Sequence, residues 1–136
     1  MTTGIAVFTR DLRVRDNPML AAATREHRHV VPLFVLDDHI GHSEFAGSGK
    51  QSFLAESLVD LDQALRRLGG GLVVRRGAVV DEVCRVASEV NAVRVHIAAD
   101  VSGYARARES ALRSALRAQR RELRCHGGAH TVVAPG

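Results

Sequence analysis

Short apolar segments alternate with longer amphipathic segments along this chain of 136 residues, and this alternation constrains the fold most strongly. The first apolar segment, residues 5–8, is followed by a loop with five charged residues, then by Asn17 and Pro18. Asn is a favoured N-cap and Pro a favoured first helical residue, so a helix is expected over residues 18–27. A strand, a polar loop and a helix in this order are typical of a parallel α/β sheet.

The same alternation continues along the rest of the chain. Apolar segments predict strands over residues 30–36, 72–74, 93–98 and 122–126, and a last extended piece over 131–133. Helical periodicity predicts helices over residues 50–68, 79–91 and 103–119. The longest of these helices carries one apolar stripe, made of Leu54, Leu58, Leu61, Leu65 and Leu68. Gly69, Gly70 and Gly71 are expected to end it.

These units predict one α/β domain over residues 1–136. Right-handed crossovers between the strands give a doubly wound, Rossmann-like sheet of five parallel strands, in the order 3-2-1-4-5, with helices on both faces. In this order the switch point lies between the first and fourth strands. The loops over residues 9–17 and 99–103 meet there, and the loop that begins at Asp37 lies beside them.

A crevice at this carboxyl edge of the sheet is the expected ligand site. It would be walled by apolar side chains and rimmed by charged and hydroxyl groups, which suits a flat, partly polar molecule. The residues expected to bind are Arg10, Leu36, Asp37, Lys50, Phe53, Asp100, Val101 and Ser102. The charged loop over residues 10–16 either docks a ligand or partner domain or holds its own shape through Arg–Asp pairs.

Other site chemistries find little support in the sequence. Neither a P-loop nor a G-x-G-x-x-G motif follows the first strand, and Gly47-Ser48-Gly49 is interpreted as a turn that enters a helix. No Ser or Cys stands with a His and an acid in a recognisable catalytic spacing, so no catalytic residue is expected. Asp37, Asp38, His39 and His42 are interpreted as a solvated loop, and no metal is expected.

Composition narrows the function classes further. The formal net charge is +4, and Lys50 is the only lysine, which permits contact with nucleic acid without establishing it. Cys84 and Cys125 form no C-x-x-C pair and are expected to be free thiols of a cytoplasmic protein. Neither a signal peptide nor an apolar stretch of ~18 residues is visible, so no membrane partner is expected.

Several motifs resemble, in order, the N-terminal region of DNA photolyases and cryptochromes. Arg10-Asp11-Leu12-Arg13 with Asp16-Asn17-Pro18 is the strongest of them. The other segments that carry the resemblance are residues 31–37, 53–65, 74–77 and 100–108. Together they cover nearly the whole chain.

This resemblance implies a light-harvesting function. In that family the N-terminal α/β domain binds an antenna chromophore, which passes excitation energy to FAD in a helical C-terminal domain. That FAD domain is absent from this chain. The chain would then be the antenna domain of a deoxyribodipyrimidine photolyase, whose partners are the C-terminal FAD domain and damaged DNA. A cut at Pro135-Gly136 is expected to expose apolar surface that the second domain would otherwise cover, so the isolated domain could form a homodimer.

The resemblance also bears on which chromophore is bound. Folate-binding members carry an Asn-Glu pair where this chain has Tyr104-Ala105, which disfavours folate. Deazaflavin-binding members carry an acid at the position of Asp100, an acid two residues later, and Arg at the position of Lys50. Here Asp100 matches, Ser102 replaces the second acid and Lys50 keeps the charge. An 8-hydroxydeazaflavin is therefore preferred, with a flavin or an empty site left open.

Two other functions are also compatible with the sequence. A cryptochrome-type photoreceptor shares the whole N-terminal region, and the residues that separate it from a photolyase would lie in the absent domain. A stand-alone nucleotide-binding or protein-interaction module of the same fold is the third possibility. A phosphate loop would favour that module, and the sequence has none.

Overall fold

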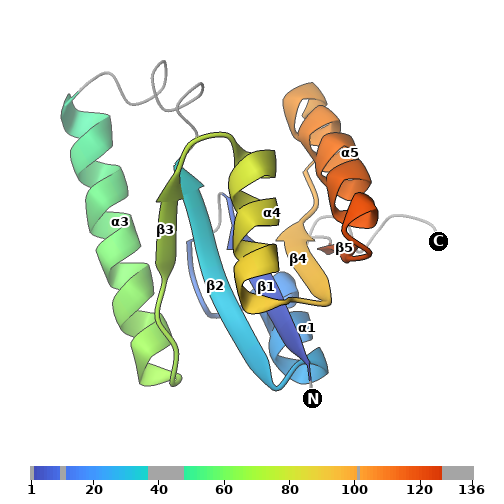
Figure 1. The fold of residues 1–136 in the computed structure, drawn as a ribbon. Helices are drawn as coiled ribbons and strands as arrows, with labels where there is room; N and C mark the ends of the chain where they lie inside the picture. The colour runs from blue at the N-terminus through green and yellow to red at the C-terminus, as the bar shows by residue number, and fades with distance from the viewer. Residues whose placement is uncertain (1, 10–11, 37–47, 101, 127–136) are drawn as a thin grey trace.

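The computed structural model describes residues 2–9, 12–36, 48–100 and 102–126, with side chains from residue 54 onward in the third of these segments. The chain alternates strands and helices throughout (Figure 1). The elements are β1 (Thr3–Phe8), α1 (Pro18–Glu26), β2 (His29–Leu36), α3 (Ser48–Arg67), β3 (Val73–Arg76), α4 (Val79–Val90), β4 (Arg94–Ala98), α5 (Gly103–Ala118) and β5 (Glu122–His126). The extended piece predicted over residues 131–133 lies outside the described residues.

The five strands form one parallel sheet in the order β3-β2-β1-β4-β5, so the predicted fold class and strand order are confirmed. The central strand β1 pairs with both β2 and β4. Val7 lies opposite Leu33 on one side and opposite Ile97 on the other. All the strands run in one direction, so the chain must return through a crossover helix after each of the first four.

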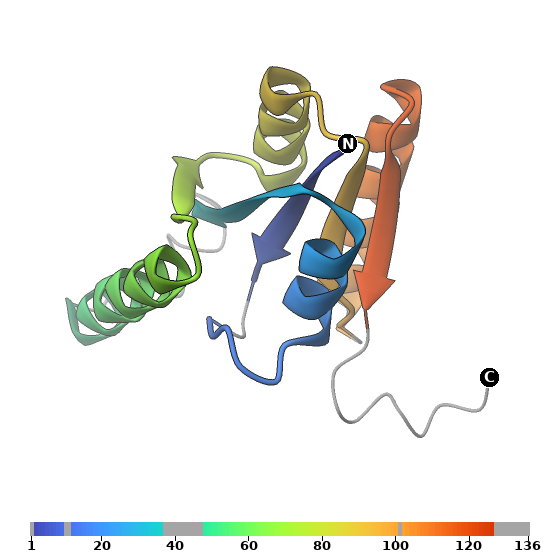
Figure 2. The same cartoon turned by 90° about the horizontal axis from the view of Figure 1, so that it is seen from below.

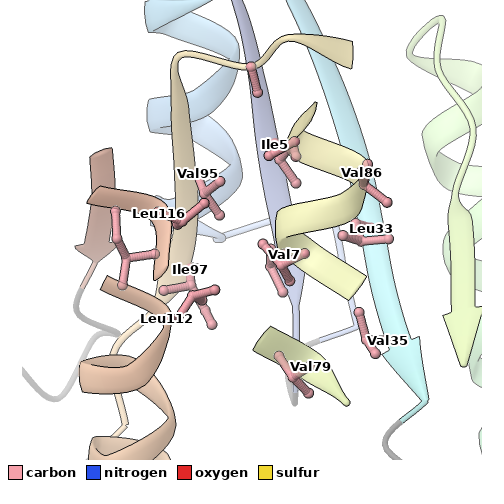
Figure 3. Packing of buried hydrophobic residues seen from close by; sticks show 14 residues of the cluster. Ile5, Val7, Leu33, Val35, Val79, Val86, Val95, Ile97, Leu112 and Leu116 are labelled. Atoms are coloured by element: carbon pink, nitrogen blue, oxygen red, sulfur yellow. The ribbon is translucent and has the colours of Figure 1, made fainter. Parts of the chain in front are cut away.

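Helices cover both faces of this sheet (Figure 2). Because side chains alternate along a strand, Ile5 and Val7 of β1 face α4 and α5, and Ala6 and Phe8 face α1 and α3. On the first face, Leu112 and Leu116 of α5 and residues of α4 pack against β1, β2 and β4 (Figure 3). Each face therefore has its own apolar core.

Local sequence fixes the ends of the helices. Asn17 caps α1 by accepting the Leu20 N–H at 3.1 Å, and Pro18 is the first helical residue, as predicted. Asn91 ends α4 in the left-handed conformation with φ 53°, which Asn adopts more readily than most residues. The sequence therefore placed these boundaries through capping chemistry.

One residue of the predicted leucine stripe does not join the core. Leu61 and Leu65 are buried on α3, but Leu68 is 68% exposed. The helix ends at Arg67 in a Schellman turn, in which Gly69 has a positive φ of 96° and the Gly70 N–H donates to Leu65 O at 2.9 Å. Since Leu68 lies beyond the last helical residue, the helical spacing no longer determines where its side chain points. Within the described segments, no helix combines the length and the apolar character needed to cross a membrane.

Candidate functional site

The switch point of the sheet lies between β1 and β4, as the strand order requires. From β1 the chain continues into α1 on one face, and from β4 it continues into α5 on the other. Phe8, Leu36 and Ala98 are the last residues of β1, β2 and β4, so the three strands end at one edge. Strands β2 and β4 flank β1, which puts their ends about 10 Å apart. Ligands of open α/β sheets bind at such an edge.

The loop from β4 to α5 is held by two short-range hydrogen bonds. The Asp100 carboxylate accepts the Ser102 N–H at 3.1 Å, and the Ser102 hydroxyl oxygen accepts the Ala105 N–H at 3.1 Å. Ser102 is therefore the N-cap of α5. Its oxygen serves the helix, but its hydroxyl hydrogen can still be donated to a ligand. Asp100 is half-buried at the same edge.

The described residues include only part of the predicted crevice. Leu36 is half-buried and packs against the core on the α1 face, and its carbonyl accepts the Gly77 N–H at 3.0 Å. Leu36, Asp100 and Ser102 thus all lie at the predicted edge. Arg10, Asp37 and Val101 lie outside the described residues, and Lys50 and Phe53 belong to α3 with side chains that are not described.

The loop from β1 to α1 is organised by Asn17. Its amide nitrogen donates to Arg13 O at 2.9 Å while its amide oxygen caps α1. The Arg13 guanidinium donates to Asp16 O at 3.3 Å, and Asp16 has a positive φ of 49°. These bonds support a shape-holding role for this part of the charged loop.

A groove of about 720 Å³ runs from this loop along α1. It is lined by loop residues such as Arg13 and Asn17, by Leu20 and Thr24 of α1, and by the exposed Leu68 after α3. Among the described residues, those that line the groove include neither Leu36, Asp100 nor Ser102 of the predicted crevice.

Polar residues gather on the α1 face of β4 and β5, which sequence reasoning did not anticipate. Strand β4 alternates Arg94 and His96 with buried Val95 and Ile97. Strand β5 places Glu122, Arg124 and His126 on that same face. The C-terminal end of α1, with Glu26 and His27, lies against these residues.

Three histidines form a continuous hydrogen-bonded chain there. Thr2 Oγ1 lies 2.9 Å from His27 Nδ1, His27 Nε2 lies 2.9 Å from His96 Nε2, and His96 Nδ1 lies 2.8 Å from His126 Nε2. His96 is 0% exposed, and burial, followed by the charge of His126, lowers its pKa from 6.5 to about 4. Burial also lowers the pKa values of His27 and His126. Burial therefore favours the neutral form of all three rings.

Glu26 is the carboxylate beside this chain. Its Oε1 atom is 3.8 Å from His96 Nε2 and 2.8 Å from Arg94 Nη1, and its Oε2 atom is 3.5 Å from Arg124 Nη1. Burial alone would raise the pKa of Glu26, but His96, Arg124 and Arg94 together hold that pKa below its usual value. Arg94 also pairs with Glu122 of β5. The positive charges of Arg94 and Arg124 are therefore balanced by the negative charges of Glu26 and Glu122.

Comparison with known proteins decides the family. The family model described as DNA photolyase matches residues 5–136. This chain belongs to the DNA photolyase family. The photolyase-family chain is 49% identical to "Deoxyribodipyrimidine photo-lyase" of Streptomyces griseus over 136 residues, which cover 100% of this chain and 30% of that protein. It is 33% identical to "Cryptochrome DASH" of Gloeobacter violaceus over 119 residues, or 84% of this chain and 24% of that protein.

Solved structures of photolyases and cryptochromes share this fold. An archaeal photolyase from Sulfolobus tokodaii, described with two FAD molecules and a light-harvesting cofactor, superimposes with a TM-score of 0.82 at 28% identity, over 92% of this chain and 29% of that one. A Synechocystis sp. PCC6803 cryptochrome superimposes with a TM-score of 0.85 at 24% identity, over 93% and 27% of the two chains, and shows the fold alone. This photolyase-family chain therefore spans less than a third of the length of these relatives.

The histidine chain of this photolyase-family domain was missed because its members are far apart in sequence. Sixty-nine residues separate His27 from His96, and 30 separate His96 from His126. The sequence does contain one indication of this polar face. Polar and apolar residues alternate in both strands, with Arg94 and His96 in the first and Glu122, Arg124 and His126 in the second. Two neighbouring strands with one polar face each predict a polar surface on a sheet that is otherwise apolar.

Proposed function

We propose that residues 1–136 are the N-terminal light-harvesting domain of a deoxyribodipyrimidine photolyase. In this proposal the domain binds an antenna chromophore at the carboxyl edge of the sheet, and a C-terminal domain holds FAD and acts on pyrimidine dimers in damaged DNA. The observation that carries the proposal is the 49% identity to the Streptomyces griseus photolyase over the whole of this chain. A cytoplasmic location and a homodimer of the isolated chain stay predictions.

The chemistry of the described residues fits a planar chromophore with a polar edge. Leu36 supplies apolar surface at the end of β2, and Asp100 and Ser102 supply an acceptor and a donor after β4. In the proposal, Arg10, Asp37 and Lys50 add charged groups, and Phe53 and Val101 add apolar ones. When bound, the chromophore would absorb light and pass the excitation energy to FAD. The protein's own task is to hold the ring rigidly and to exclude water, without proton transfer.

The preferred chromophore is an 8-hydroxydeazaflavin. The acid at Asp100 and the positive charge at Lys50 match the pattern of deazaflavin-binding members, and Tyr104-Ala105 departs from that of folate-binding members. A flavin is the second candidate, because the Sulfolobus tokodaii photolyase is described with two FAD molecules and a light-harvesting cofactor. The two ligands share a three-ring system and differ in their redox chemistry.

A binding titration tests the site. The purified chain is mixed separately with 8-hydroxydeazaflavin, FAD and a reduced folate, and ligand fluorescence and induced circular dichroism are recorded. We expect the deazaflavin to bind and Asp100→Asn to weaken it by about tenfold, the loss of one charge-assisted hydrogen bond. Asp60→Asn, on an exposed position of α3, is the matched control and should leave binding unchanged. FAD binding alone would replace the chromophore, and no binding by any ligand would refute the antenna site.

A repair assay tests the whole protein. The gene is expressed through its natural stop codon, and the product is illuminated with DNA that contains cyclobutane pyrimidine dimers. Loss of dimers in the light and not in the dark would support a photolyase. A flavin-containing product without repair would favour a cryptochrome-type photoreceptor, and a product without flavin would favour a stand-alone module.

A further inference from the structure

The side chains of Glu26, His27 and His96 converge at the C-terminal end of α1. One ligand-type atom from each of the three residues lies within 4.8 Å of the other two. The two histidines face each other through their Nε2 atoms, and Glu26 Oε1 faces His96 Nε2. We propose that these three residues bind one divalent transition-metal ion of the zinc class. The site lies on the α1 face of β4 and is separate from the carboxyl-edge crevice proposed for the chromophore.

The distances suit a tetrahedral ion. Zinc bonds of about 2.0–2.1 Å to nitrogen and oxygen put neighbouring ligand atoms about 3.3 Å apart. His27 Nε2 and His96 Nε2 are 2.9 Å apart, and His96 Nε2 and Glu26 Oε1 are 3.8 Å apart. The two observed separations lie on either side of the required one. The third separation, between His27 and Glu26, is within 4.8 Å, and a rotation of the partly exposed Glu26 side chain would shorten it. Three bonds would then form and leave a fourth position for water.

The outer nitrogen of each histidine already has a partner. A histidine that binds metal through Nε2 carries its hydrogen on Nδ1, and that N–H needs an acceptor. Thr2 Oγ1 can accept from His27 Nδ1 at 2.9 Å, and His126 Nε2 can accept from His96 Nδ1 at 2.8 Å. Both rings are thus oriented with Nε2 inward. Binding then needs a tautomer shift and no loss of a proton, because neutral imidazoles are the ligating form.

Burial also favours a metal site here. His27 is 6% exposed and His96 is 0% exposed, so their side chains lose little further entropy on binding. The Glu26 side chain is 25% exposed and gives the ion a route from solvent. Two imidazoles and one carboxylate form a donor set that zinc takes in proteins. A bound ion would join the end of α1 to the neighbouring strand β4.

Two arginines compete with the ion for the Glu26 carboxylate. Arg94 Nη1 lies 2.8 Å from Glu26 Oε1, the same oxygen that would bind the metal, and Arg124 approaches the other oxygen at 3.5 Å. The ion must displace Arg94, which can keep its second partner, Glu122. Removal of the Arg94 charge should therefore tighten metal binding, an effect that general damage to the fold would not produce.

The test uses the 136-residue chain after treatment with a chelator. Zn²⁺ is titrated by calorimetry, and Co²⁺ is titrated by visible absorption, whose intensity reports a tetrahedral site. We expect one ion per chain. His96→Gln and Glu26→Gln should each weaken binding by about tenfold or more. Arg94→Gln should strengthen it by several-fold, and His29→Gln, an exposed histidine at the start of β2, should leave it unchanged.

Folding controls keep the outcome clear. Circular dichroism shows whether His96→Gln is folded, and if it is not, the partly exposed Glu26→Gln carries the comparison. Zn²⁺ should also shift the ring resonances of His27 and His96 in the NMR spectrum of the unmodified chain, and not those of His29. No binding by the unmodified chain, or full binding by a folded His96→Gln or Glu26→Gln variant, would overturn the site.

Discussion

The carboxylate of Asp62 joins the end of α3 to the start of β3 by accepting the Leu72 N–H at 2.8 Å. Its second oxygen pairs with Arg66 Nε at 2.8 Å, one turn later on the same helix. These bonds hold the pKa of Asp62 below its usual value, with the Arg66 hydrogen bond as the larger cause and the Leu72 N–H next. The Asp62 carboxylate thus links α3 to Leu72, across the glycine turn that joins α3 to β3.

This relationship predicts how stability depends on pH. A carboxyl whose folded-state pKa is lowered stabilises the fold at pH values above its unfolded pKa, and this contribution is lost as the pH falls through the folded value. We expect Asp62→Asn to be less stable than the unmodified chain at pH 7, and the difference to shrink below about pH 4. Urea unfolding across this pH range measures the difference in the free energy of unfolding. Asp60→Asn is the exposed control, and an equal loss of stability in that variant would contradict the role given to the Asp62 hydrogen bonds.

Gly4 predicts a second effect, because β1 passes very close to His27. A Cβ atom at Gly4 would overlap the His27 ring, so the ring would have to leave its hydrogen bonds with Thr2 and His96. We expect Gly4→Ala to lower the free energy of unfolding by about 1–3 kcal/mol, the usual cost of overpacking. Gly103→Ala should be neutral, since a Cβ there meets no atom within 4 Å. Thermal unfolding of both variants checks this, and equal stabilities would contradict it.

Two leucines near the end of α3 differ in burial, so their substitutions can be compared directly. Leu65 is 3% exposed and Leu68 is 68% exposed, although the sequence predicted one stripe for both. Leu65→Ala should cost about 2–5 kcal/mol through the cavity that it leaves. Leu68→Ala should change the free energy of unfolding by less than about 0.5 kcal/mol. Chemical denaturation of both variants is the measurement, and a large loss for Leu68→Ala would mean that its side chain is packed in solution.

Ser102 separates helix capping from ligand binding. Ser102→Ala should lower the free energy of unfolding by about 1 kcal/mol, because the Ala105 N–H loses its acceptor. Ser102→Asp keeps a capping oxygen and adds a negative charge at the helix N-terminus, so it should be at least as stable as the unmodified chain. If the proposed function holds, Ser102→Asp should also bind 8-hydroxydeazaflavin more tightly. Unfolding curves and fluorescence titrations report the two effects separately.

The stability result for Ser102 does not depend on the chromophore. If Ser102→Asp is stable but binds the ligand no more tightly, the N-cap role of residue 102 is supported. The same result would count against 8-hydroxydeazaflavin as the chromophore. An unstable one would contradict the capping geometry itself.

The sequence by itself determined the order of the elements and the topology of the sheet. Apolar segments of strand length, helical stripes and caps such as Asn17 act within a few residues of one another, so local physics fixes them. The right-handed crossover rule then leaves few ways to order five parallel strands. The switch point and the edge that holds Asp100 follow from that order.

Only the tertiary structure decided which distant residues meet. The contact between His27 and His96 depends on the register of β1 against β4 and on where α1 ends, and no local signal carries either of these. Leu68 lies outside the core because the helix ends at Arg67, before the three-glycine turn and one residue earlier than the leucine stripe predicted. Such contacts arise when strands pair and helices pack, because a periodic pattern gives the direction of a side chain but not its partner.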